Sequence, residues 1–425
     1  MPDWSSRLEE LAGRSGVPGA VLGIWADGEQ LVAPYGVLNR ATGLEVTADS
    51  VFQVGSITKI WTATLITQLV AEGKLSLDDT VVGLLPEAPI DARITVRHLL
   101  THQSGLDGDV FTDTGRGDDC LERYVGLLGK VDQLFDPGTA YSYCNAGFVV
   151  LGRLIEVLDK RSWDDALRVR LSERLGLEHT MTLPEEAILH RSALGHTADG
   201  VPVKTWNLPR SIGPAGLITQ SAGDLLTFAR LHLDQYAEMR APQVPFPGGA
   251  EGVEAIGTAW RLYDWSGRKL FGHDGETVGQ LAFLRIDPEA RLAVCLLTNS
   301  VNAPALFEQL VSEVFTDYVG VAAPPRPEPI EGGAAGDDHV GVYERAGVRL
   351  EVERRGSRLV MTYRVTGDRL AVAEDPVVEY ELYPTAPDDG NHFVTRSAPG
   401  QPWVPLTFTP AYLFTSGRVT PRRTG

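Results

Sequence analysis

A serine and a lysine one helical turn apart form the most informative pair of residues in this chain. Ser56 and Lys59 follow Gly55, and apolar residues then recur at helical spacing through Val70. Because residues i and i+3 share a helix face, the Ser56 hydroxyl and the Lys59 amine can meet. A serine is a poor nucleophile until a neighbour takes its proton, which a desolvated lysine can do. The pair therefore predicts acyl-transfer chemistry.

A simpler interpretation of the pair is that Ser56 caps a helix and Lys59 is a solvated charge in its first turn. Ser266 and Lys269 have the same spacing, but they lie in a Gly-containing turn between strand-like runs, so the spacing alone is weak evidence. Lys59 is one of only six lysines and directly precedes apolar residues, which argues against a solvated charge.

Tyr143 and Asn145 form a second group with chemical potential. They precede a helix-like run that continues to about Asp159. A phenol can shuttle protons if a nearby ammonium lowers its pKa, and an amide can anchor a substrate carbonyl. The alternative is a buried aromatic residue followed by an asparagine that caps the helix.

His273 and Gly275 form a third group, just before two strands over residues 279–287 and 291–298. A glycine after a histidine on an edge strand leaves room for a ligand against the backbone. The alternative for His273 is an ordinary hydrogen-bonded loop histidine.

In order and rough spacing, the three groups resemble the serine β-lactamase and penicillin-binding-protein superfamily, on the branch of class C β-lactamases, D-aminopeptidases and esterases. Residues 51–56, 97–106 and 213–219 are similar to that branch as well. The resemblance covers roughly residues 10–320. It implies that Ser56 is the nucleophile and Lys59 its proton acceptor.

The same resemblance implies roles for the other groups. Tyr143 would pass the proton to the leaving group, and Asn145 would hold the substrate amide. The oxyanion hole would use the N–H of the nucleophile and that of Glu276, the residue after Gly275. His273 stands where many relatives have the lysine of Lys-Thr-Gly, so binding of a β-lactam carboxylate is doubtful and antibiotic hydrolysis is not the first expectation.

Residues 108–120, with no export signal in the chain, resemble a narrower group, the penicillin-binding-protein-type thioesterases. Those enzymes release nonribosomal peptides from carrier-protein thioesters, often by head-to-tail macrocyclisation, and commonly accept a D-residue at the acyl end. A simple esterase, a D-aminopeptidase or DD-peptidase and a β-lactamase-like hydrolase stay open as alternatives. So does a non-catalytic sensor or binding protein.

Composition restricts the partners. The net charge of −18 disfavours nucleic acid and anionic membranes, so the expected partner is a peptidyl or acyl small molecule, or its carrier-protein thioester. Without a signal pattern or a long apolar run, the expected compartment is the cytoplasm. The three cysteines are expected to be reduced thiols.

No metal or cofactor is expected. His98 and His102 have the spacing of a zinc pair but lack a third ligand, and Asp107 and Asp109 resemble a calcium loop only superficially because Phe111 takes the next ligand position. There is no phosphate loop and no dinucleotide fingerprint.

The chain is expected to fold as an α+β catalytic domain over residues 1–321, with one sheet covered by helices on both faces. A hairpin over 17–35, a mainly helical insert from about 75 to 235, strands from 255 to 298 and a helix over 303–319 indicate this arrangement.

Residues 322–338 are rich in proline and glycine and are expected to be a linker. Residues 339–425 are expected to form a small antiparallel barrel, which resembles the lipocalin-like C-terminal barrel of several relatives. The barrel could shape the substrate cleft or merely stabilise the protein. Arg418 could reach a substrate carboxylate or be a solvated tail charge. The expected strands cover residues 339–344, 348–353, 358–364, 369–372, 377–382, 392–395, 403–408 and 411–416.

Overall fold

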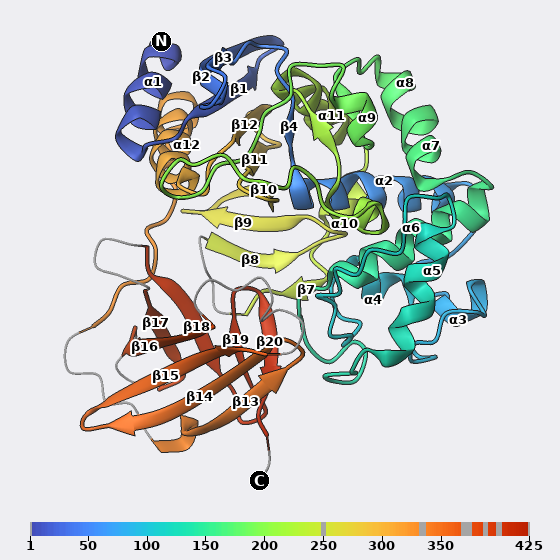
Figure 1. Cartoon of the computed structure of the whole chain (residues 1–425), viewed down its shortest axis with the longest axis vertical. Helices are drawn as coiled ribbons and strands as arrows, with labels where there is room; N and C mark the ends of the chain where they lie inside the picture. The colour runs from blue at the N-terminus through green and yellow to red at the C-terminus, as the bar shows by residue number, and fades with distance from the viewer. Residues whose placement is uncertain are drawn as a thin grey trace.

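The computed structural model describes residues 2–247, 252–330, 337–366, 376–385, 390–396 and 402–423. A large sheet with helices on both faces occupies one half of the molecule, and a smaller all-β unit lies beside one edge of it (Figure 1). Among the described residues, no helix is both long and apolar enough to cross a bilayer. The predicted domain boundaries at residues 321 and 338 stay a prediction.

The large sheet has nine strands in the order β3-β2-β1-β12-β11-β10-β9-β8-β7. Its pairings are antiparallel, so hairpins join most neighbouring strands. The predicted hairpin over 17–35 is confirmed as β1 and β2. The strands are β1 Gly19–Ala26, β2 Glu29–Asn39, β3 Leu44–Glu45, β7 Val244–Pro245, β8 Val253–Ile256, β9 Arg261–Trp265, β10 Arg268–Glu276, β11 Leu281–Asp287 and β12 Leu292–Thr298.

Helices cover both faces of this sheet, as predicted. On β1, Ala20, Leu22 and Ile24 face the core shared with α1 (Trp4–Ser15) and α12 (Ala303–Val319). Val21 and Trp25 face the other core, shared with α2 (Thr58–Ala71) and α11 (Ala222–Asp234). Because side chains alternate along a strand, a strand covered on both faces is apolar throughout.

The helical insert lies on the α2 side of the sheet (Figure 1). The helices of the insert are α3 Val81–Leu84, α4 Val96–Leu100, α5 Cys120–Leu127, α6 Asn145–Asp159, α7 Trp163–Leu167, α8 Glu173–Leu175, α9 Pro184–Ala187 and α10 Gly213–Gly216. A small sheet in the order β4-β6-β5 accompanies the insert, and its strands are β4 Phe52–Gln53, β5 Thr180–Met181 and β6 Thr219–Gln220.

The C-terminal unit is an eight-stranded antiparallel barrel, which confirms the predicted fold class. Its strands follow chain order, and the first and last meet where the N–H of Arg423 donates to the carbonyl of Val342 over 2.8 Å. The strands are β13 Gly341–Arg345, β14 Val348–Arg355, β15 Arg358–Val365, β16 Val377–Pro384, β17 His392–Thr395, β18 Val404–Phe408, β19 Tyr412–Thr415 and β20 Arg418–Pro421.

The strand content of the barrel differs from the expectation at two places. The strand predicted over residues 369–372 lies outside the described residues. Strand β20 was not predicted, although Ser416 and Gly417 form its turn with positive φ values of 50° and 76°. A Ser-Gly pair between alternating runs is typical of a tight hairpin turn, so the signal was present.

The prediction that His273 lies on an edge strand is wrong, because its strand β10 lies between β9 and β11. However, the pairing with β9 ends where Gly272 faces Arg261, while the pairing with β11 continues to Glu276. Residues 273–276 therefore keep one backbone edge open, and the residues around Ser56 approach that edge.

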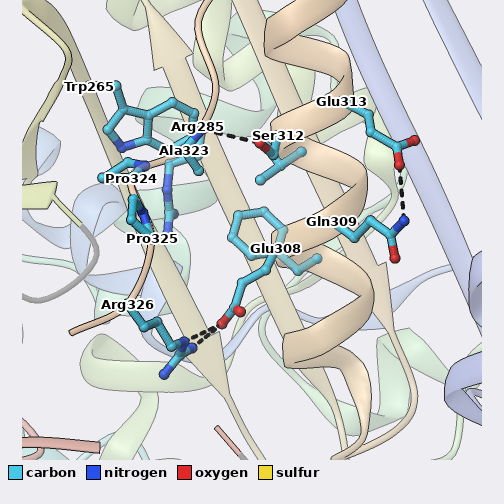
Figure 2. A pocket seen from close by; sticks show the side chains of 12 residues that line it. Trp265, Arg285, Glu308, Gln309, Ser312, Glu313, Ala323, Pro324, Pro325 and Arg326 are labelled. Atoms are coloured by element: carbon cyan, nitrogen blue, oxygen red, sulfur yellow. Dashed lines mark hydrogen bonds and ion pairs between the residues drawn. The ribbon is translucent and has the colours of Figure 1, made fainter. Parts of the chain in front are cut away.

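A cavity of about 380 Å³ lies on the α12 side of the large sheet (Figure 2). Trp265 and Phe307 line it, and residues 323–326 pass over it along α12, where the N–H of Ala323 donates to Ser312 Oγ over 3.2 Å. This cavity contains none of the residues predicted for the active site.

Candidate active site

Ser56 and Lys59 lie where the chain turns from β4 into α2. The 3₁₀ turn η1 (Gly55–Ile57) carries Ser56, and Lys59 is in the first turn of α2. Lys59 Nζ donates to Ser56 Oγ over 3.0 Å and to the carbonyl oxygen of Ala215 over 2.6 Å. The contact expected from the i,i+3 spacing is therefore present.

Lys59 is fully buried, so the interpretation as a solvated charge is wrong. Burial lowers its pKa well below the usual value, the positive charge of Arg418 lowers it further, and Asp109 opposes both. A lowered pKa favours the neutral amine, which is the form that can accept the proton of Ser56.

Tyr143 lies beneath this amine. Lys59 Nζ is 4.8 Å from the centre of the Tyr143 ring, and the Tyr143 hydroxyl is buried. Burial raises the pKa of Tyr143, and the neighbouring Ser56 hydroxyl opposes the rise. A pKa lowered by an ammonium was the condition for a proton shuttle, and this condition is not met because burial dominates. Tyr143 therefore starts as a protonated phenol and can donate a proton.

His102 and the barrel hold Tyr143 in place. The rings of His102 and Tyr143 are 4.3 Å apart, and the N–H of Cys144 donates to His102 Nδ1 over 3.0 Å. From the other side, the N–H of Tyr143 donates to the carbonyl of Gly417 over 2.9 Å. The position of the phenol thus depends on both halves of the molecule.

His98 and His102 do not form a zinc pair. The ring of His98 accepts from the N–H of Thr95 and caps α4, whereas His102 lies beyond the end of that helix with a positive φ of 58°. Among the described residues, no group of three or more potential ligands could hold a metal ion.

Two glycines bring the backbones of Ser56 and Glu276 together. A Cβ on Gly275 would lie 1.8 Å from the carbonyl oxygen of Val54 and 2.8 Å from the nitrogen of Ser56. A Cβ on Gly55, which has a positive φ of 50°, would lie 2.5 Å from the nitrogen of Glu276. Only glycine tolerates such close approach, so the backbone segments that carry the N–H groups of Ser56 and Glu276 lie directly against each other.

His273 lies behind the cleft rather than on its surface. It is only 1% exposed, and its ring centre is 6.3 Å from that of Tyr143. Nδ1 is 2.6 Å from the carbonyl oxygen of Asp274, so Nδ1 carries the proton in this contact. Burial, with Arg261 and Lys59, lowers the pKa of His273 well below the usual value. The position therefore holds a neutral ring and no cation.

Asn145 and Arg418 meet through Asp109. Asn145 Nδ2 donates to Asp109 Oδ1 over 3.0 Å, and Arg418 Nε and Nη2 contact the two carboxylate oxygens of Asp109 at 2.6 and 2.9 Å. Only 25% of the Arg418 side chain is exposed, so the interpretation as a solvated tail charge is wrong. Its guanidinium lies 5.2 Å from the Tyr143 ring centre.

Sequence reasoning missed the role of Asp109. It was considered only as part of a superficial calcium loop, because its partner Arg418 lies 309 residues further along the chain. Arg345, also from the barrel, lies 3.5 Å from Asp109 and 3.7 Å from Asp107. Nothing in the local sequence marks these pairs, since they depend on how the barrel docks.

The cleft has a volume of about 590 Å³ and is lined by both halves of the molecule. Lys59 lies beneath its surface, and His273 lies behind it. Of the residues expected from the sequence, the following line it: Ser56, Tyr143, Asn145, Gly275, Glu276 and Arg418. Phe111, Tyr141 and Phe246 add an apolar wall.

The chain is similar to several known proteins. The Beta-lactamase family profile matches residues 4–310. "Penicillin-binding protein 4" of Amycolatopsis lactamdurans is 40% identical and covers 81% of this chain and 97% of its own. The D-aminopeptidase of Brucella anthropi is 27% identical over 62% of this chain and 52% of its own.

Among solved structures, that of SurE superposes with a TM-score of 0.81 at 29% identity. It covers 99% of this chain and 98% of its own, so the similarity includes the barrel. A second structure of SurE, with D-Leu, superposes with a TM-score of 0.80.

Proposed function

Because this chain belongs to the beta-lactamase family, we propose that it is a serine acyl-enzyme hydrolase or acyltransferase with Ser56 as the nucleophile. The observation that carries this proposal is the 3.0 Å contact between Ser56 Oγ and the fully buried amine of Lys59. A neutral amine at hydrogen-bond distance from a hydroxyl is the geometry that general-base activation requires.

In the first step, Lys59 takes the proton of Ser56 as Oγ attacks a substrate carbonyl carbon. The N–H groups of Ser56 and Glu276 stabilise the oxyanion of the tetrahedral intermediate. The proton passes from Lys59 through Tyr143 to the leaving group as the bond between that group and the carbonyl carbon breaks, which leaves the acyl group on Oγ and Lys59 neutral again. In the second step the acceptor, water or an amine, bonds to the carbonyl carbon, its proton passes through Tyr143 and Lys59 to Oγ, and the C–Oγ bond breaks.

Asn145 orients the acyl part of the substrate. The carboxylate of Asp109 can only accept, so the Asn145 atom that faces it is Nδ2, and the amide oxygen is left for a substrate N–H. Arg418 braces Asp109 and presents further N–H donors to a substrate carboxylate or carbonyl. The neutral His273 cannot supply the charge of the lysine in Lys-Thr-Gly, so a β-lactam carboxylate would depend on Arg418 for a cationic partner.

The favoured substrate is a peptidyl thioester with a D-residue at its acyl end, and the favoured product is a cyclic peptide. Two observations support this subclass. The similarity to SurE extends over 99% of the chain at 29% identity, and a structure of that protein contains D-Leu. The barrel also contributes Ser416, Gly417 and Arg418 to the cleft, which gives an extended peptide more surface than a small ester needs.

Intact-protein mass spectrometry tests the proposal. The probe is a short peptidyl N-acetylcysteamine thioester that ends in a D-residue. We expect an acyl adduct, or a product that has lost the thiol, with the wild type and not with Ser56→Ala. Ser266→Ala is the matched control, because it removes the serine of the second Ser-x-x-Lys, in the β9–β10 turn.

The mass of the product separates the two acceptors, since a cyclic peptide and a hydrolysed peptide differ by one water. Turnover of simple esters or D-residue amides alone would favour an esterase or a D-aminopeptidase instead. A wild-type protein that acylates without turnover, or that does not acylate at all, would favour the sensor or binding protein.

A further inference from the structure

The side chain of Glu276 lies where two cavities meet. It lines the cleft that contains Ser56, and it also lines a cavity of about 600 Å³ at the mouth of the barrel. Phe111, Ser416 and Arg418 line both spaces as well. The cleft therefore continues into the barrel mouth past Glu276.

The other acidic groups around this passage have cationic partners. Asp109 pairs with Arg418 and Arg345, and Asp107 pairs with Arg345. Asp274, beside Glu276 on β10, pairs with Arg261 at 2.9 Å and with Arg285 at 2.6 Å.

Glu276 differs from these groups. Within the ranges that the structure describes, its carboxylate makes no hydrogen bond or ion pair with the protein. The nearby charge that acts on this carboxylate is that of Arg418, whose guanidinium contacts Asp109 instead. Its side chain is exposed to the cleft, yet the surrounding protein excludes enough water to raise the pKa of its carboxyl group, which Arg418 opposes. A cationic ligand would supply the missing partner.

The position of Glu276 also fits the reaction. The backbone N–H of Glu276 lies beside the turn that carries Ser56, where the acyl carbonyl must lie. The carboxylate belongs to the same residue, so it can reach a group bound close to that carbonyl. A cation held by this carboxylate is therefore one side-chain length from the reacting carbon. The barrel mouth offers Val348, Leu350 and Tyr363 to the apolar side chains that accompany such a cation.

We propose that Glu276 binds the ammonium group of the acceptor amine, at the passage between the cleft and the barrel mouth. In a cyclisation this ammonium is the amino end of the same peptide whose acyl end is bound to Ser56. The inference rests on the proposed acyl-enzyme function and identifies where its second substrate group binds.

The ammonium gives one proton to the Glu276 carboxylate, which later releases it to solvent. The free amine attacks the acyl carbon, so that a C–N bond forms and the C–Oγ bond breaks. The second proton of the amine passes through Tyr143 and Lys59 to Ser56 Oγ, and the products are an amide and free serine.

The test measures how the acyl-enzyme divides between acceptors. Wild type, Glu276→Gln and the control Glu289→Gln, an exposed glutamate in the β11–β12 turn, are incubated with a peptidyl N-acetylcysteamine thioester ending in a D-residue. Cyclic and hydrolysed products come from the same acyl-enzyme, so their ratio does not depend on how fast Ser56 is acylated. We expect Glu276→Gln to lower this ratio about tenfold or more, because a charged hydrogen bond to the amine is lost. Glu289→Gln should leave it unchanged.

A neutral acceptor distinguishes binding of a cation from support of the site. With the N-acetylated thioester and added methanol, the ratio of methyl ester to acid should be the same in wild type and Glu276→Gln. An equal loss of both transfers in Glu276→Gln, an unchanged cyclisation ratio, or a wild type that forms the acyl-enzyme and only hydrolyses it would overturn the amine site alone. Absence of any acyl-enzyme in the wild type would overturn the proposed function as well.

Discussion

Replacement of Gly275 by alanine is the most direct perturbation of the predicted oxyanion hole. The new Cβ would lie 1.8 Å from the carbonyl oxygen of Val54 and 2.8 Å from the nitrogen of Ser56. Both neighbours are backbone atoms in a buried segment, so no flexible side chain can move aside. The strand β10 and the turn η1 must separate, and the N–H groups of Ser56 and Glu276 must separate with them.

The size of the effect follows from the size of this displacement. Ordinary contact distances require the two backbones to move apart by more than about 1 Å, and a misplacement of 1 Å in an active site can cost about 100-fold in rate. Loss of one oxyanion donor costs about 100- to 1,000-fold in kcat. We therefore expect kcat to fall at least 100-fold, whereas KM for a small ester should change far less.

The assay is steady-state turnover of a nitrophenyl ester, with thermal unfolding followed by circular dichroism to verify the fold. Gly126→Ala in α5 is the matched control, because a Cβ there meets no atom within 4 Å, and it should keep full activity. A folded Gly275→Ala protein with kcat within a few-fold of the wild type would refute the oxyanion assignment of this backbone.

Three further predictions concern protonation. In the proposed mechanism acylation requires neutral Lys59, and Arg418 lowers the pKa of Lys59 whereas Asp109 raises it. The acid limb of the pH profile of kcat/KM should therefore move to higher pH in Arg418→Gln and to lower pH in Asp109→Asn. Shifts of the two variants in the same direction would contradict this assignment. Tyr143→Phe should reduce turnover of a D-residue amide about 100-fold more than that of a nitrophenyl ester, whose leaving group needs no proton, as parallel rate measurements would show. Burial lowers the pKa of His232 to about 3. Below about pH 6.5 the unfolded chain therefore binds a proton at His232, whereas the folded protein binds it only near pH 3. The free energy of unfolding should therefore fall as the pH decreases from about 6.5 to 3, by up to about 1.4 kcal/mol per pH unit, and urea titrations of His232→Gln should show a smaller slope.

The sequence was sufficient for the parts of the site that short-range geometry determines. Ser56 and Lys59 meet because three residues complete about one helical turn, and α2 is apolar on nearly all sides, which buries the lysine. Gly275 determines where Glu276 lies, because a Cβ at this position would collide with the backbone around Ser56. These relations need only local spacing and the steric properties of single residues.

The sequence was insufficient wherever the site depends on docking. Asp109 and Arg418 are brought together by the approach of the barrel, and no periodicity in either segment encodes that approach. The raised pKa of Tyr143 could not be predicted for a related reason, since burial is a property of the assembled fold and it outweighs the nearby charges.

The docking contacts favour the barrel as part of the site over a stabilising appendage. Val419 at the start of β20 donates its N–H to Ser142 Oγ over 3.2 Å, and the carbonyl of Gly417 accepts from the N–H of Tyr143. The β19–β20 turn thus holds the segment that carries the phenol, while Arg418 from the same turn braces Asp109 and, through it, Asn145. Two groups to which the proposed mechanism assigns a role, Tyr143 and Asn145, take their positions from one hairpin of the barrel. A change in that hairpin should therefore alter proton transfer and substrate orientation together, which a purely stabilising unit would not do.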